Sequence, residues 1–248
     1  MRILVIILFL SLIFVADCFA PDADTKLLIH FNGADGAQTY TTEDAGSRTV
    51  TFTAEAQLDT AQAKFGSASL LLDGTGDYVG VPDSDDWDFG TGDFTFDLQV
   101  RWNTVTGTQE MLSSWEDASN FIRFYKAGDG TIGIWANRAG SSVGEFATTS
   151  SAGMVANTWY HIAVVRNGTS CFIFVDGTSL AVTQTTAWGL LPNLVSPPFQ
   201  VGVRNNDIYL NGWVDEVRVS KGIARWTSDF TAPTSEYNGV SKKLFIVN

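Results

Sequence analysis

Two carboxylates stand side by side at Asp215 and Glu216, and paired carboxylates are the groups that hydrolyse glycosidic bonds. That reaction needs two carboxyl groups about 5–10 Å apart that face the same substrate. Consecutive residues of a strand point to opposite faces, so we predict that this pair cannot share a substrate. Glu110, Glu116 and Glu145 also lack a partner at a suitable spacing. We therefore expect no glycosidase activity and no enzyme.

A serine-hydrolase pattern occurs at residues 140–144, where Gly-Ser-Ser-Val-Gly matches Gly-x-Ser-x-Gly. The pattern supports catalysis only on a strand-turn-helix elbow, and no helical sequence follows it here. The two histidines, His30 and His161, both lie within apolar runs. We interpret the pattern as a Gly/Ser loop and the histidines as core or sheet-face residues.

Aromatic side chains that face water beside polar groups could bind a sugar. Residues 121–125 and 131–136 read as a hairpin, and placing Ile132 and Ile134 inward turns Trp135 outward. Aromatic rings offer sugars an apolar platform, and charged or amide groups supply hydrogen bonds. The alternative is that Trp135 and Tyr125 only pack beneath a loop. The predicted ligand-binding set, expected on one face, is Arg123, Tyr125, Trp135, Asp97, Gln99 and Arg101. Trp115, Trp188 and Tyr209 could rim it, although their faces cannot be assigned from the sequence.

The element that must position half of this set is the clearest strand in the chain, residues 94–102. Its apolar residues alternate strictly with polar ones, which predicts one buried and one wet face. The expected inward residues are Phe94, Phe96, Leu98, Val100 and Trp102, and the outward ones are Thr95, Asp97, Gln99 and Arg101.

Short runs rich in Val, Ile, Phe, Tyr and Thr recur along the chain, separated by Gly and Asp turns. About a dozen such strands predict an all-β, antiparallel two-sheet β-sandwich, with a closed barrel as the alternative. The remaining expected strands are 27–31, 49–53, 69–72, 78–81, 110–115, 159–165, 171–175, 200–203 and 213–219, with one helical turn at 223–226.

The bulk composition limits the partners. The chain has 248 residues, 17% of them charged, and a formal net charge of −12. An acidic surface repels phosphate backbones, so we expect no nucleic-acid partner. The acidity also suits cation binding, or simply the solubility of a secreted protein. The length fits one large β domain.

The N-terminus reads as a signal peptide at residues 1–20, because Arg2 precedes an apolar run over residues 3–15. That run is too short for a membrane span. Cleavage could follow Cys18 or Ala20, and lipidation of Cys18 is an alternative. Residues 21–25 form a short lead. We expect a protein that is secreted, extracellular or on the cell surface, with no stable membrane span after cleavage.

Four segments together resemble a known family. They are residues 65–79 (Phe-Gly-Ser-Ala-Ser-Leu-Leu-Leu-Asp-Gly-Thr-Gly-Asp-Tyr-Val), 87–95, 159–168 and 212–226. Their order and spacing resemble laminin-G-like (LamG) domains of the concanavalin A-like lectin/glucanase superfamily, over roughly residues 26–237. The resemblance implies a jelly-roll of two curved antiparallel sheets that binds glycans, glycoproteins or other proteins. Fold alone does not decide between these.

The resemblance also implies a structural Ca²⁺ where the first and last strands meet. The matching ligands here are Asp215, Asn32 in the region of residues 31–32, and Gly74. A carboxylate within the apolar run 213–217 costs free energy unless it is paired. The alternative is that Asp215 is exposed at an edge, or pairs with Arg218 or Arg225.

We therefore expect a non-catalytic binding module for a glycan or glycoprotein surface. The alternative is a structural or adhesive subunit of a surface layer, appendage or virion, which would use the same fold for protein contacts. Residues 238–248 form a basic, then apolar tail that could support self-association by adding to a neighbour's sheet edge.

Overall fold

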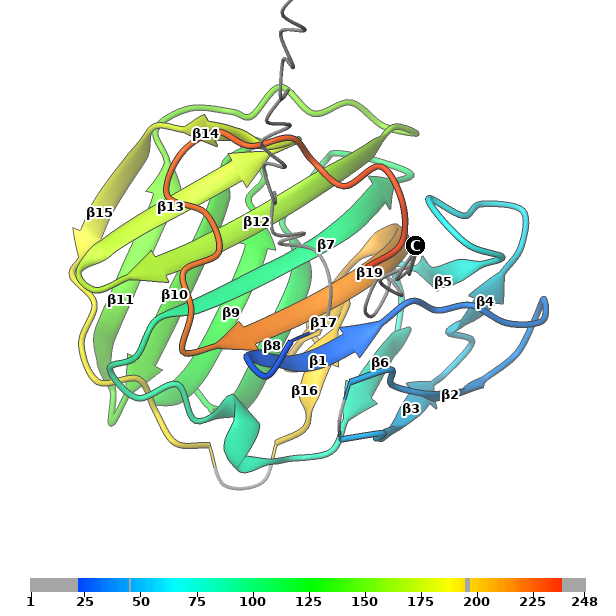
Figure 1. Cartoon of the computed structure of the whole chain (residues 1–248), viewed down its shortest axis with the longest axis horizontal. Coiled ribbons are helices and arrows are strands. Elements are labelled where there is room, and N and C mark those ends of the chain that lie inside the picture. The colour runs from blue at the N-terminus through cyan, green and yellow to red at the C-terminus, as the bar shows by residue number, and fades with distance from the viewer. Residues whose placement is uncertain (1–21, 45, 195–196, 238–248) are drawn as a thin grey trace, which may run out of the picture.

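The computed structural model describes residues 22–44, 46–194 and 197–237, which form two packed antiparallel sheets (Figure 1). The all-β sandwich prediction is confirmed. The expected signal peptide, with Cys18, and the C-terminal tail lie outside the described residues.

One sheet has eight strands in the order β14-β13-β12-β7-β19-β5-β4, with β1 pairing to β19. Its strands are β1 (Thr25–Ile29), β4 (Gln57–Asp59), β5 (Ser69–Asp73), β7 (Phe94–Trp102), β12 (Trp159–Asn167), β13 (Ser170–Val175), β14 (Thr178–Leu180) and β19 (Asn211–Lys221).

The other sheet has nine strands in the order β15-β11-β10-β9-β8-β16-β6-β3-β2. They are β2 (Thr39–Thr41), β3 (Thr49–Thr53), β6 (Tyr78–Val81), β8 (Gln109–Asp117), β9 (Asn120–Lys126), β10 (Ile132–Arg138), β11 (Ser141–Thr148), β15 (Val182–Thr186) and β16 (Phe199–Val201). A short ribbon of β17 (Val203–Arg204) and β18 (Ile208–Tyr209) and one 3₁₀ turn, η1 (Asp85–Trp87), complete the elements.

The core lies between the sheets and contains the predicted apolar face of β7. Phe96 on β7 reaches Phe199 on β16, with ring centroids 5.8 Å apart, so aromatic contacts cross from one sheet to the other. Each fully buried side chain of this size contributes about 1.5–3 kcal/mol relative to exposure.

The polar face of β7 was expected to be wet, and that prediction is wrong. Residues 222–237, which we call the strap, leave β19 and cross the outer face of the eight-stranded sheet (Figure 1). Trp226 and Phe230 of the strap stack 4.0 Å apart and pack over Phe174 and His161. Residues 223–226 of the strap form no regular secondary structure, so the predicted helical turn is also wrong.

Beneath the strap lies a buried charge network centred on Asp97. Arg218 Nε donates to Asp97 at 3.0 Å, and both side chains are fully buried. The Tyr237 hydroxyl donates to the same carboxylate, and His161 Nε2 lies 3.5 Å from it. Burial alone would raise the pKa of Asp97, but the Arg218 charge and the contacts with His161 and Tyr237 lower it to about 2.

The low pKa of Asp97 predicts a loss of stability in acid. The folded-state pKa lies below the ordinary value of 3.8, so the ionised carboxylate stabilises the fold above that value and ceases to do so as the pH falls towards 2. The shift corresponds to about 2 kcal/mol. In urea unfolding, the free-energy difference between wild type and Asp97→Asn should shrink by about that amount between pH 5 and pH 2. An equal difference at both pH values would contradict this role.

A β-bulge in β19 changes the expected directions of the paired carboxylates. The register with β7 shifts between Asp215 and Arg218, and Glu216 adopts a positive φ of 50°. Asp215 accepts from the Lys64 and Phe65 amides, while Glu216 accepts from the Tyr237 amide of the strap. Both carboxylates therefore point away from the core, and the prediction of opposite faces is wrong.

Candidate functional site

A row of aromatic side chains runs across the outer face of the nine-stranded sheet. Trp115 on β8 stacks on Phe121 on β9, with centroids 4.3 Å apart and planes at 11°. Phe121 in turn meets Trp135 on β10 edge to face at 4.9 Å. Phe121 is buried, while Trp115 and Trp135 are half-buried, so the row offers partly exposed indole rings.

An ion pair lies on the same face. Arg123 donates to Glu110 at 2.8 Å, and both side chains are buried. The guanidinium carbon of Arg123 lies 4.0 Å from the ring centroid of Tyr125, which is half-buried. Arg123 and Glu110 therefore neutralise each other beneath the aromatic side chains and do not offer an exposed charge to a ligand.

The row ends in a pocket of about 300 Å³ beside Trp115, which we call the Trp115 pocket. That volume lies at the lower end of small-molecule sites. Hydrogen-bonding side chains surround one aromatic ring, as recognition of a polar, ring-shaped ligand requires. Its lining is Trp115, Glu116, Pro197, Pro198, Gln200, Asn205 and Asn206.

The loop that closes the Trp115 pocket connects β17 and β18. Asn205 and Asn206 both have positive φ, 47° and 54°, a conformation that Asn tolerates better than most residues. Arg204 pairs with Asp207 across this turn, and its guanidinium lies 5.5 Å from the Trp115 ring. The turn is thus tied to the aromatic row.

The structure divides the predicted ligand set between two sheets. Arg123, Tyr125 and Trp135 lie on the outer face of the nine-stranded sheet, as the hairpin pattern predicted. The strand that carries Asp97, Gln99 and Arg101 belongs to the eight-stranded sheet, so the expected common face is wrong. Alternation tells which side chains share a face of one strand but not which sheet the strand joins.

The second half of that set is also poorly accessible. Asp97 and Gln99 are 0% and 1% exposed, and Arg101 is half-buried with its guanidinium 4.7 Å from the Trp213 ring. Of the suggested rim residues, Trp115 does line a pocket, whereas Trp188 is buried between Phe94 and Phe146.

Comparison with known proteins defines the family. A laminin G family model, described as the concanavalin A-like lectin/glucanases superfamily, matches residues 73–225, more than half of the chain. The chain belongs to this family. No curated protein matches it in sequence.

Solved structures share the fold of this laminin-G-like domain. Domain 4 of AbnA, an extracellular arabinanase from Geobacillus stearothermophilus, solved with arabinotriose, has a TM-score of 0.63 at 16% identity and covers 81% of this chain and 94% of that one. The binding domain of Paraclostridial Mosquitocidal Protein 1 gives 0.60 at 14%, covering 82% and 50%. The binding domain of Botulinum Neurotoxin DC, solved with SialylT, gives 0.57 at 11%, covering 82% and 49%. The chain thus spans about half of the two toxin domains.

The residues considered for catalysis have other roles in this laminin-G-like domain. Asp215 and Glu216 are 0% and 1% exposed and bind backbone amides, so neither is open to a glycan. Residues 141–144 belong to β11 and only Gly140, with Ala139, lies in the turn after β10, so the prediction of a Gly/Ser loop is wrong. The segment is a β-hairpin and not a nucleophile elbow. Within the described residues, no helix is both long and apolar enough to cross a bilayer.

The residues expected to hold Ca²⁺ do not fit that ion. Asn32 and Asp215 each hold the loop at residues 64–67, since Asn32 Oδ1 accepts from the Ser67 amide at 2.6 Å. Gly74 packs elsewhere, against Asn211, four residues before Asp215. Asp215 is already satisfied by amide donors, which compete with a cation for its oxygens.

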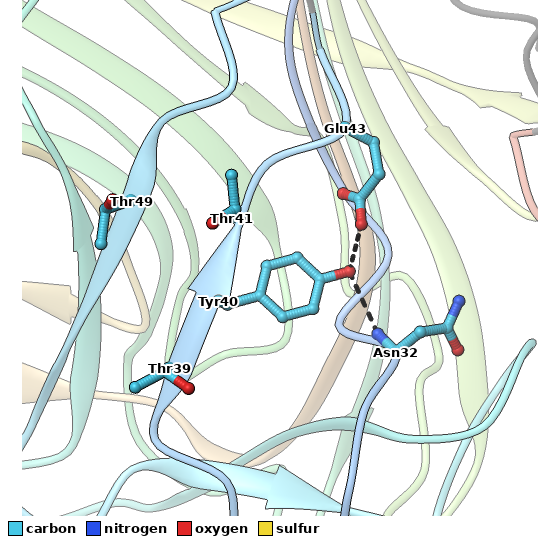
Figure 2. A pocket seen from close by; sticks show the side chains of 6 residues that line it. All are labelled: Asn32, Thr39, Tyr40, Thr41, Glu43 and Thr49. Carbon is cyan, nitrogen blue, oxygen red and sulfur yellow. Dashed lines mark hydrogen bonds between the residues drawn. The ribbon is translucent and has the colours of Figure 1, made fainter.

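A second pocket, of about 430 Å³, opens beside β2 and β3 (Figure 2). The Tyr40 hydroxyl donates to Glu43 and accepts from the Asn32 amide (Figure 2). Burial and the hydrogen bond with Glu43 raise the pKa of Tyr40, and burial raises that of Glu43. We call this the Tyr40 pocket, and its lining is Asn32, Thr39, Tyr40, Thr41, Glu43 and Thr49.

Proposed function

We propose that this domain is a non-catalytic module that binds carbohydrate at the Trp115 pocket and along the aromatic row towards Trp135 and Tyr125. The observation that carries the proposal is a half-buried indole, Trp115, surrounded by amide and carboxyl side chains in one small pocket. An apolar ring next to hydrogen-bonding groups matches the two surfaces of a pyranose or furanose.

The side chains of the Trp115 pocket supply both kinds of hydrogen-bonding group. Gln200, Asn205 and Asn206 carry amides that donate and accept, while Glu116 accepts. A sugar hydroxyl does both as well, so the groups are complementary. The arabinanase domain and the neurotoxin domain with the same fold were solved with arabinotriose and SialylT, which supports sugars as the first ligands to test.

The site suits a protein that works outside the cell, as proposed from the N-terminal sequence. A glycan or glycoprotein surface would be the partner. Use of the same face for protein contacts in an extracellular assembly is the competing function, and the tail proposed for self-association lies outside the described residues.

A binding screen tests the proposal. The purified protein is titrated by calorimetry with arabinotriose and with a sialylated oligosaccharide, and then screened on a glycan array. We expect saturable binding of at least one class. If the folded protein binds no glycan but forms stable oligomers or captures a surface protein through the Trp115 face, the assembly function replaces the carbohydrate function.

A further inference from the structure

Three metal-ligating side chains converge from distant parts of the chain. His30 follows β1, Glu216 lies at the bulge of β19, and Glu236 belongs to the strap. One potential ligand atom of each lies within 4.8 Å of the others, and His30 Nδ1 stands 2.8 Å from Glu216 Oε1. Local chain geometry alone does not produce this arrangement, because it needs the bulge and the strap together.

The cluster carries excess negative charge. Among the residues the structure describes, Glu216 forms an ion pair only with His30, and neither Glu236 nor Glu43 forms one with Lys or Arg. Glu43 is nevertheless close, since its Oε2 accepts from the His30 amide at 3.3 Å. Three carboxylates therefore lie near one imidazole; Glu216 is only 1% exposed, Glu236 is half-buried and Glu43 is exposed. A buried carboxylate with too few cationic partners favours binding of a metal cation.

We propose that His30, Glu216 and Glu236 bind one divalent transition-metal ion of the zinc type. Imidazole nitrogen together with carboxylate oxygen is the donor set that such ions use, whereas Ca²⁺ takes oxygen ligands alone. The site is separate from the Trp115 pocket, which lies on the nine-stranded sheet. Glu216 is on β19 of the eight-stranded sheet, and Glu236 is on the strap that crosses that sheet.

The distances suit this ion after a small adjustment. Ligand atoms around a tetrahedral zinc ion lie about 3.3 Å apart, given bonds of about 2.0–2.2 Å. Glu236 is half-buried, and rotating its side chain while redirecting its hydrogen bond from Asn32 would close the remaining distance of up to about 1.5 Å. His30 Nδ1 and Glu216 Oε1 would separate slightly from 2.8 Å. The fourth position would belong to water.

Neighbouring groups orient the ligands and leave a path to solvent. Asn32 Nδ2 donates to Glu236 Oε1, while its Oδ1 is fixed by the Ser67 amide at 2.6 Å. Gly66, at a φ of 60°, lies so close to Asn32 and Glu236 that a Cβ there would collide with both. Asn32 and Glu43, two neighbours of the cluster, also line the Tyr40 pocket (Figure 2), so a hollow open to solvent lies beside the proposed site.

Metal titration tests the proposal with a spectroscopic readout. The chelator-treated protein is titrated with Co²⁺ and Zn²⁺, following the visible d–d bands of bound Co²⁺ and the bound metal per chain by mass spectrometry. We expect one equivalent of either ion, tetrahedral Co²⁺ bands that Zn²⁺ abolishes, and a higher melting temperature with Zn²⁺.

Variants separate this site from surface binding. His30→Gln and Glu236→Gln should each weaken Co²⁺ binding at least tenfold, while Glu55→Gln, at an exposed carboxylate outside the cluster, should bind as wild type does. Circular dichroism establishes that each variant folds, and Glu236→Gln keeps an acceptor for Asn32. No stoichiometric Co²⁺ or Zn²⁺ in the folded wild type, binding of Ca²⁺ alone, or binding unchanged in both ligand variants would overturn the proposal. Glycan binding plays no part in any of these outcomes.

Discussion

Arg218→Met should destabilise the domain by about 3–5 kcal/mol, the cost of leaving a buried carboxylate without its partner. Arg218 and Asp97 are both fully buried, and Arg218 also lies 4.1 Å from the Tyr237 ring of the strap. Methionine keeps most of the apolar stem and removes the charge, so the loss reports the ion pair and not a cavity. Urea unfolding followed by tryptophan fluorescence measures it.

The control is an Arg–Asp ion pair at the surface. Arg204 pairs with Asp207, whose side chain is 46% exposed, and Arg204→Met should cost less than about 1 kcal/mol. The double variant Asp97→Leu/Arg218→Met should recover part of the stability, because two apolar groups replace a broken pair. Equal losses for Arg218→Met and Arg204→Met would show that the strap is not held by this network.

Trp115→Ala should weaken glycan binding by about 30-fold, or about 2 kcal/mol, if Trp115 is the central aromatic contact of the site. The substitution removes the ring that lines the pocket and the surface against which Phe121 stacks. Trp135→Ala should have a smaller effect, since Trp135 meets the row only through Phe121. Calorimetric titration with the oligosaccharide found in the screen gives both values.

Trp213→Ala is the matched control, because Trp213 is also half-buried and also lies beside an arginine, Arg101, but on the eight-stranded sheet. We expect its glycan affinity to equal that of wild type. A loss of binding in Trp213→Ala with none in Trp115→Ala would move the site to the opposite face.

Local pattern predicted most of the longer strands and the buried face of β7, because alternation of apolar residues reflects only the neighbours of each residue. It missed β11 and the short edge strands β2, β4, β14 and β15. It did not predict the strap. The strap is far from β7 in sequence, and only the folded chain shows that its Tyr237 bonds to Asp97 and that its Trp226 packs on Arg218, the partner of Asp97. The same limit explains the error over Asp215 and Glu216, since a bulge is set by pairing between strands.

The sequence predicted only the part of the candidate site that depends on a single strand. The outward direction of Trp135 follows from its own strand, and the structure agrees. The Trp115 pocket forms instead where β16 and the turn at residues 205–206 meet β8. The sequence around Gln200, Asn205 and Asn206 did not indicate that these side chains would line a pocket. His30 was interpreted as a core or sheet-face residue because neither Glu216 nor Glu236 is near it in sequence.

The central claim is that glycan binds on the outer face of the nine-stranded sheet, and the indole N–H resonances test it most directly. The chain has 8 tryptophans, so a ¹⁵N-labelled sample reports on both faces in one spectrum. On titration with the bound oligosaccharide, we predict shifts at Trp115 and Trp135 and none at Trp213 or Trp226. Shifts at Trp213 or Trp226 with Trp115 and Trp135 unchanged would contradict it.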